Sequence, residues 1–155
     1  MGAIRIIRLL VVEHNSAFLY LIQKAFADRM EQIRWKLTVA QDGQTALDIL
    51  FAEEYQNRPL PDLILLDWNL PKVTGSEVLR RIKDHPKLRR MPVLVFSSSQ
   101  ADDDIHAAYD SHANGYITKP DSAEALEAIV KTIEQFWSAI ARLPKITRSV
   151  GLPKT

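Results

Sequence analysis

Five short apolar runs alternate with helical patterns along this chain, and the alternation limits the folds that it can adopt. The apolar runs are Leu9–Val12, Trp35–Ala40, Leu63–Leu66, Pro92–Phe96 and Gly115–Thr118. Their length and aliphatic character suit strands that are buried on both faces. The helical patterns cover Ser16–Asp28, Gln44–Phe51, Ser76–Lys83, Asp102–Tyr109 and Ser122–Leu143. Repeated strand–helix alternation predicts an α/β fold with a doubly wound, five-stranded parallel sheet.

One domain accounts for most of the 155 residues, because a chain of this length suits a single compact core. We expect residues 1–143 to form the domain, with an extended last helix, and residues 144–155 to form a mobile tail. The apolar stripe of the last helix continues to Phe136, Trp137 and Ile140. Because the stripe extends past the expected edge of the sheet, we expect a homodimer contact there. The alternative is that these last turns fold back onto the same domain.

Composition excludes several classes of function. The net charge of +1 argues against a commitment to nucleic acid or to an anionic membrane. There is no cysteine, which excludes disulfides and thiolate metal sites and is compatible with the cytoplasm. No apolar run approaches the roughly 20 residues that a membrane-spanning helix needs. We therefore expect a cytoplasmic protein that binds neither nucleic acid nor membrane.

The residues that end the predicted strands share a chemical character. The first strand ends in Glu13 and His14, the third in Asp67, the fourth in Ser97 and the fifth in Lys119. Each residue alone would suit an ordinary cap, turn or solvated position. In a parallel sheet, however, the carboxyl ends of the strands meet at one edge, where ligands bind. The coincidence of acids, a hydroxyl and an ammonium group therefore predicts a functional site at that edge.

Four motifs in order, "LLVVEHN", "DLILLDWNLPKVTG", "PVLVFSSS" and "NGYITKP", give the chain a family resemblance. It resembles the receiver domain of two-component response regulators, with the single-domain, chemotaxis-type fold, from about Leu9 to Gln135. The segment "FWSAIARLP" is similar to the end of stand-alone regulators that accompany phytochrome-type histidine kinases. The resemblance implies a response regulator that takes a phosphoryl group from a sensor histidine kinase and signals by protein contact, with no separate small-molecule substrate.

The resemblance also implies roles for individual residues at the strand ends. Asp67 matches the carboxylate that accepts the phosphoryl group, a nucleophile that forms an aspartyl phosphate. Ser97 matches the hydroxyl residue that contacts the phosphoryl group and shifts inward when it arrives. Lys119 matches the lysine that pairs with the phosphoryl oxygens.

Three further positions match the family pattern. Tyr116 corresponds to the aromatic switch residue on the partner-binding face. Asn69 would offer its main-chain carbonyl to a divalent ion that Glu13 and Asp67 also help to bind. The Lys119–Pro120 peptide bond is expected to be cis, a form that is accessible at modest cost only before proline.

His14 departs from the family pattern, because receivers normally end the first strand with two acids. Mg²⁺ prefers oxygen ligands, whereas imidazole suits transition metals. The resemblance implies Mg²⁺ as the cofactor, and His14 in place of an acid should weaken its binding. Either the protein still accepts phosphate, slowly or with another metal, or it is a receiver-like interaction module whose phosphorylation is weak or absent. We favour the first, because Asp67, Ser97 and Lys119 are all present.

Other functional classes fit the sequence less well. A flavin- or nucleotide-binding protein of the same architecture would need a glycine- or hydroxyl-rich loop after the first strand, and "EHNSAF" contains no glycine. A hydrolase that uses Asp67 as nucleophile would want a second acid just after it, and none follows. A DNA-binding regulator would need an output domain, and we expect none in the segment after Leu143.

Overall fold

A five-stranded parallel sheet forms the centre of the molecule, in a computed structural model that describes residues 5–28 and 33–146. The strands are β1 (Arg5–Val12), β2 (Ile33–Ala40), β3 (Leu63–Asp67), β4 (Val93–Ser97) and β5 (Gly115–Thr118). Their order across the sheet is β2-β1-β3-β4-β5. The predicted α/β fold and its five strands are confirmed.

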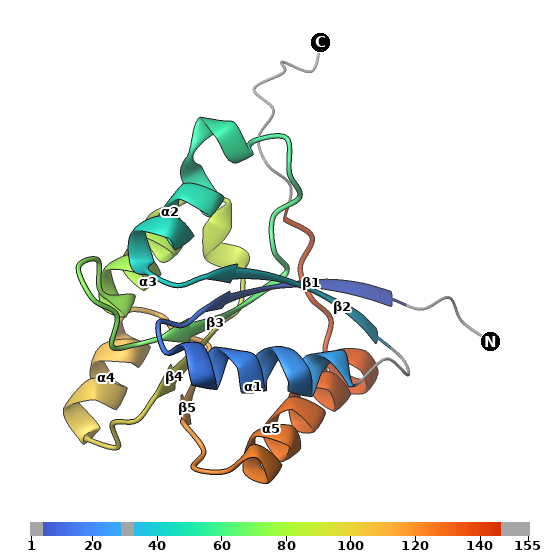
Figure 1. Ribbon diagram of the computed structural model, residues 1–155. Coiled ribbons are helices and arrows are strands. Elements are labelled where there is room, and N and C mark those ends of the chain that lie inside the picture. The colour runs from blue at the N-terminus through green and yellow to red at the C-terminus, as the bar shows by residue number, and fades with distance from the viewer. Residues whose placement is uncertain (1–4, 29–32, 147–155) are drawn as a thin grey trace.

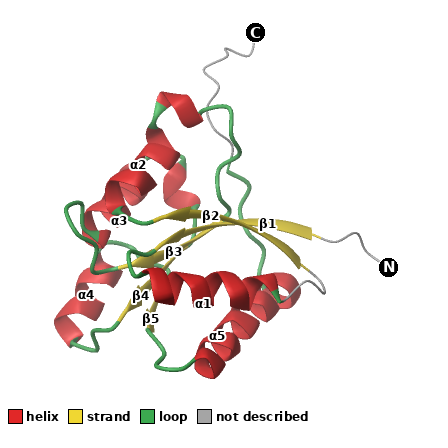
Figure 2. Cartoon of the chain, in the orientation of Figure 1, coloured by secondary structure: helices red, strands yellow, loops and turns green. Residues whose placement is uncertain are grey.

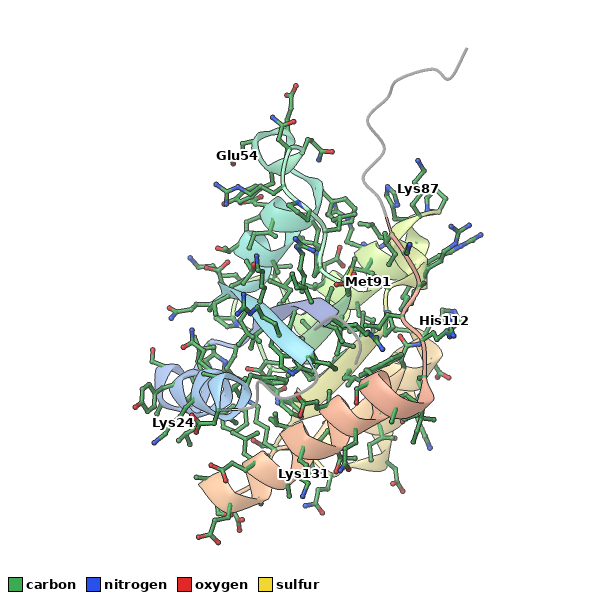
Figure 3. All side chains as sticks on the ribbon, turned by 90° about the vertical axis from the view of Figure 1, so that its right-hand side faces the viewer. Lys24, Glu54, Lys87, Met91, His112 and Lys131 are labelled. Atoms are coloured by element: carbon green, nitrogen blue, oxygen red, sulfur yellow. The ribbon has the colours of Figure 1, made fainter. Side chains whose placement is uncertain are left out.

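Helices cover both faces of the sheet (Figure 1). They are α1 (Ser16–Ala27), α2 (Gly43–Phe51), α3 (Gly75–Asp84), α4 (Asp102–Asp110) and α5 (Ala123–Gln135), with short 3₁₀ turns η1 (Glu53–Tyr55) and η2 (Leu88–Arg90). One core cluster lies between the sheet and the helices α1 and α5. The other lies on the opposite face, against α2, α3 and α4. The exposed Lys24 of α1 and Lys131 of α5 lie on the outside of the first of these layers (Figure 3).

Polar side chains define where four of the helices begin. Asn15, Asp42, Thr74 and Ser122 each accept a hydrogen bond from a backbone N–H of the first helical turn. Each of these bonds satisfies a donor that the helix itself leaves unpaired. The cap at Asn15 therefore fixes the start of α1 shortly after the end of β1.

The two strands at the β2 edge are longer than their apolar runs indicated. β1 begins at Arg5 and β2 at Ile33, and the two pair in parallel over eight residues, from Arg5 opposite Ile33 to Val12 opposite Ala40. Arg5 and Arg8 interrupt the apolar pattern of β1, so the apolar pattern alone does not indicate that the strand begins at Arg5. Backbone pairing does not require apolar side chains, and it carries the strand through these residues.

The last helix is shorter than predicted. α5 ends at Gln135, and the chain continues as one π-helical segment, η3 (Phe136–Ile140), instead of reaching Leu143. The N–H of Ala141 donates to the carbonyl of Phe136 at 2.7 Å, and Ala141 itself is extended. The widened turn therefore ends the helix at Ile140, several residues before Pro144, and the prediction of a helix over Ser122–Leu143 is wrong.

The chain after η3 turns back across the amino-terminal end of the sheet (Figure 2). Residues 138–145 face Arg5, Ile6, Ile7 and Asp62 across a shallow pocket. Ile146 packs against the core cluster on the α2 and α3 side. The predicted mobile tail began at Pro144, and its residues 147–155 lie outside the described residues. Within residues 5–28 and 33–146, no helix has the length and apolar character needed to cross a membrane.

Candidate functional site

The carboxyl ends of β1, β3, β4 and β5 meet at one edge of the sheet, on the left of Figure 1. β3 lies between β1 and β4, with Leu66 opposite Val12 and Asp67 opposite Phe96. This register places Glu13, Asp67 and Ser97 at the ends of adjacent strands, and Lys119 follows the end of β5. The predicted convergence of these residues is confirmed by the topology.

Two buried carboxylates share one lysine at this edge. Glu13 and Asp67 are each 1 % exposed. Lys119 Nζ lies 2.9 Å from Glu13 Oε1 and 3.4 Å from Asp67 Oδ1. Burial of a charge is costly unless an opposite charge or hydrogen bonds offset it. Lys119 therefore balances one of two negative charges, and a net negative charge remains for a further cation.

The protonation of Glu13 reflects this environment. Burial raises the pKa of Glu13 above its ordinary value, and the neighbouring charge of Asp67 acts in the same direction. Hydrogen bonds from Lys119 and from the backbone N–H of Asn15 oppose this increase in pKa. Desolvation is the largest of these effects on the pKa of Glu13. An added positive charge at the site would lower this pKa and favour the ionised form of Glu13.

His14 reaches into the site from the edge that faces solvent. Its side chain is 44 % exposed, and its Nδ1 lies 2.7 Å from Asp67 Oδ2 and 3.7 Å from Glu13 Oε2. Because an ionised carboxylate can only accept a hydrogen bond, Nδ1 is the donor to Asp67. His14 therefore directly contacts the residue that the family resemblance identifies as the phosphoacceptor.

The backbone around Asp67 is held by residues of the β3–α3 connection. The N–H of Asn69 donates to Asp67 Oδ1 at 3.1 Å. A Cβ atom on Gly75 would lie 2.5 Å from the carbonyl oxygen of Asp67. Only glycine allows α3 to begin so close to the end of β3. Sequence reasoning did not single out Gly75, although it lies within the "DWNLPKVTG" motif.

Ser97 and Asn69 form the β4 side of the site. Ser97 is fully buried, and its Oγ accepts a hydrogen bond from the backbone N–H of Ser99 at 3.1 Å. Asn69 Nδ2 lies 3.5 Å from Ser97 Oγ. Asn69 was expected to contribute only its main-chain carbonyl, so the position of its amide beside the Ser97 hydroxyl is an addition from the structure.

Tyr116 lies on β5, next to the β4–α4 loop. Its ring is half-buried, and its hydroxyl donates to the carbonyl of Ser99 at 2.9 Å. The hydroxyl of Ser99 in turn accepts a hydrogen bond from the backbone N–H of Ala101, within the same loop. The predicted switch residue is thus tied to the same loop that follows Ser97.

The Lys119–Pro120 bond differs from the prediction, because no peptide bond between described residues is cis. The trans form is intrinsically the more stable one even before proline. In this form the N–H of Lys119 donates to the carbonyl of Ser97 at 2.8 Å, and the Lys119 side chain still reaches both carboxylates. The predicted cis bond is therefore wrong.

Phe18 is a second residue that sequence reasoning missed. The Lys119 ammonium lies 5.0 Å from the centroid of its ring, within the range of a cation–π contact. The ring also packs edge-on against Phe96 of β4, with centroids 6.0 Å apart. Its position in the first turn of α1, three residues after the Asn15 cap, is the only signal in the sequence that places it near the site.

The donor atoms at this edge suit a divalent cation. One ligand atom from each of Glu13, His14 and Asp67 lies within 4.8 Å of the other two. Two carboxylates and an imidazole are established metal ligands, and the net negative charge favours a cation. The residues therefore fit a divalent ion, with one nitrogen donor where the family pattern has oxygen.

The residues predicted for a dimer contact lie away from this site, at the end of the last helix. Phe136 is 45 % exposed and Ile140 is 76 % exposed. Trp137 is half-buried and packs against the core on the α1 and α5 side. The centroids of the Trp137 and Phe136 rings are 4.9 Å apart. Phe136 and Ile140 are therefore accessible, whereas much of Trp137 belongs to the domain itself.

Known proteins are similar to this chain in both sequence and fold. The profile of the response regulator receiver domain matches residues 9–131. The probable methanogenesis regulatory protein FilR2 of Methanothrix harundinacea (strain 6Ac) is 42 % identical over 139 residues, which cover 88 % of this chain and 86 % of that protein. Response regulator Rcp1 of Synechocystis sp. is 41 % identical over 137 residues, covering 88 % and 92 %.

Solved structures agree with this assignment. The Mn²⁺-bound form of Rcp1 has a TM-score of 0.80 at 40 % identity and covers 89 % of this chain and 99 % of its own. The phosphorylated cyanobacterial phytochrome response regulator RcpA has a TM-score of 0.82 at 45 % identity, covering 89 % and 98 %. These relatives are matched along nearly their whole length. The chain belongs to the response regulator receiver domain family and is homologous to single-domain phytochrome response regulators.

Proposed function

We propose that Asp67 accepts a phosphoryl group from the phosphohistidine of a sensor histidine kinase in the cytoplasm, and that the phosphorylated protein signals through protein contacts. The observation that carries the proposal is the position of Asp67, a buried carboxylate 3.4 Å from the ammonium of Lys119. Ser97, on the next strand, supplies a hydroxyl on the other side. The site thus combines a nucleophile with groups that can bind phosphoryl oxygens.

In the proposed transfer, a carboxylate oxygen of Asp67 forms a bond to phosphorus while the phosphorus–nitrogen bond of the donor breaks. The leaving imidazole takes up a proton, and the product is an aspartyl phosphate. Charge on the equatorial oxygens is the main quantity to be stabilised in such a transfer. Lys119 supplies a positive charge, and the Ser97 hydroxyl and the Asn69 amide supply donors.

A divalent ion belongs to this proposal. Glu13, Asp67, the Asn69 carbonyl and His14 would hold it, and it would add positive charge beside the incoming phosphoryl oxygens. The existence of an Mn²⁺-bound form of the relative Rcp1 supports a divalent ion in this fold. Mg²⁺ should bind weakly here, because His14 supplies a neutral nitrogen in place of a charged oxygen.

A second candidate function has its own supporting observation. The hydrogen bond of 2.7 Å between His14 Nδ1 and Asp67 Oδ2 occupies one oxygen of the proposed acceptor. Phosphorylation would have to break this contact. A receiver-shaped interaction module that is phosphorylated weakly or not at all would retain it.

Labelled phosphodonor distinguishes the two functions. We expect wild-type protein incubated with a phosphorylated histidine kinase to acquire label that is stable in acid and labile in base. Asp67→Asn should abolish it, whereas Asp102→Asn, at the exposed start of α4, should not. Label that persists in Asp67→Asn would refute the acceptor assignment, and unlabelled wild-type protein would favour the interaction module.

We further propose a phytochrome-type kinase as the donor. RcpA is a cyanobacterial phytochrome response regulator, and it matches this chain over most of its length. Transfer from a panel of purified kinases, one of them a phytochrome, tests this assignment. Faster transfer from an unrelated kinase would contradict it.

The exposed Phe136 and Ile140 support a homodimer that forms through the end of the last helix. Exposed aromatic and aliphatic side chains of this kind are typical of protein interfaces. In sedimentation experiments we expect a dimer for the wild type and a monomer for Phe136→Ser combined with Ile140→Ser. Tyr20→Ser is the matched control, since Tyr20 is an exposed aromatic residue on α1. A monomeric wild type would refute the dimer.

A further inference from the structure

The metal-binding edge of this receiver contains a side-chain nitrogen that points at the carboxylates. His14 Nδ1 lies 2.7 Å from Asp67 Oδ2 and 3.7 Å from Glu13 Oε2. Neighbouring ligands on a six-coordinate ion with bonds of about 2.1 Å are separated by about 3 Å. The observed separations lie on either side of this value. One ligand atom from each of the three side chains lies within 4.8 Å of the other two, so the three can close around one ion if the more distant pair moves together.

We propose that His14 is a direct nitrogen ligand, and that the site consequently selects first-row transition metals over Mg²⁺. The proposal rests on the proposed function, because the ion shares Asp67 with the phosphoryl group. In the metal-bound state the proton of the neutral ring is on Nε2. The hydrogen bond between His14 Nδ1 and Asp67 is then replaced by bonds from both groups to the ion.

The charge of the site favours this selectivity. With both carboxylates ionised, Glu13 and Asp67 contribute a charge of −2 and Lys119, which contacts both, contributes +1, so the net charge is −1. An acid at position 14 would bring the total to −2. Mg²⁺ depends on charged, hard oxygen ligands, so it loses most from the neutral imidazole. Co²⁺ and Ni²⁺ regain part of this loss through the bond to nitrogen, and Mn²⁺ regains less because it also favours oxygen ligands.

The exposure of His14 makes the arrangement accessible. Its side chain is 44 % exposed, whereas those of Glu13 and Asp67 are 1 % exposed. The imidazole is thus the outermost of the three ligands, so an ion that enters from solvent meets His14 before it reaches the two carboxylates.

Titration calorimetry with the intact chain and no phosphodonor tests the selectivity. Affinities for Mg²⁺ and Co²⁺ are compared in wild type, in His14→Asp and in His106→Gln, a control on the exposed face of α4. We expect the preference for Co²⁺ over Mg²⁺ to fall by about tenfold or more in His14→Asp and to stay unchanged in His106→Gln. Equal preferences in wild type and His14→Asp would overturn the proposal.

A spectroscopic measurement on the wild type alone keeps the proposal testable if the variant folds poorly. Pulsed electron paramagnetic resonance of the Mn²⁺-loaded protein should show coupling to a directly bound nitrogen, and ¹⁵N-labelling of histidine should change that coupling. Absence of histidine coupling, or failure of Mn²⁺ to bind, would overturn the proposal. Since no phosphodonor is present, these results are independent of whether Asp67 accepts phosphate.

Discussion

Lys119 places its ammonium 2.9 Å from Glu13 Oε1, so the last strand of the sheet is tied to the end of the first strand by an ion pair. The pair lies among buried groups, since Glu13 is 1 % exposed and Lys119 only 14 % exposed. Lys119 also lies close to Asp67. One lysine therefore stabilises two carboxylates that would otherwise repel each other.

Replacement of Lys119 by methionine should destabilise the metal-free protein. Removing one partner of a largely buried pair leaves uncompensated charge, which costs roughly 3 kcal/mol in the free energy of unfolding. Urea unfolding measures this loss, and Lys131→Met, on the exposed side of α5 (Figure 3), is the matched control. A divalent ion should restore part of the stability in Lys119→Met. Equal stability of the two variants would contradict the role of Lys119.

The raised pKa of Glu13 predicts how stability depends on pH. Because the folded-state pKa lies above the ordinary value of 4.5, folding is favoured by protonation of Glu13. This contribution is fully present below pH 4.5 and is lost as the pH rises through the folded-state pKa. The side chain of Glu13→Gln cannot titrate. In metal-free protein, the free energy of unfolding of this variant should therefore decrease less over this pH range than that of the wild type. Parallel curves for the two proteins would show that Glu13 does not contribute.

Gly75→Ala should disturb the site through the backbone. The added Cβ would lie 2.5 Å from the carbonyl oxygen of Asp67, whereas at Gly115 it would meet only the end of the Leu94 side chain, at 2.9 Å. Backbone cannot rotate away as a side chain can, so we expect a loss of about 1–3 kcal/mol for Gly75→Ala and a smaller loss for Gly115→Ala. Thermal or urea unfolding compares the two. A larger effect at Gly115 would contradict the close approach of α3 to β3.

The strand–helix alternation was sufficient to predict the sheet and the meeting of Glu13, Asp67, Ser97 and Lys119. These residues follow buried strands, and parallel topology brings strand ends together without any further information. The Glu13–Lys119 ion pair could not be predicted, because it depends on how far the Lys119 side chain, just after β5, reaches past β4 and β3 to the end of β1.

The errors in prediction have local causes. The amino-terminal half of β1 contains Arg5 and Arg8. These charged residues interrupt the apolar pattern, although backbone pairing with β2 continues the strand through them. The apolar pattern from Leu126 to Ile140 suits a regular helix, but hydrophobic spacing does not distinguish an α-helix from the π-helical segment that ends it at Ile140. Likewise, motif similarity at Lys119-Pro120 does not determine the isomer of the bond, which is trans here.

Asp67 itself is expected to carry the phosphoryl group. Borohydride reduces an aspartyl phosphate to homoserine, so peptide mass spectrometry after phosphorylation and reduction identifies the modified residue. The experiment is run with Mg²⁺ and with Mn²⁺ present, so that weak Mg²⁺ binding does not hide the reaction. We predict homoserine at position 67 of the wild type. Unmodified Asp67 under both conditions, or homoserine at another aspartate, would show that Asp67 is not the acceptor.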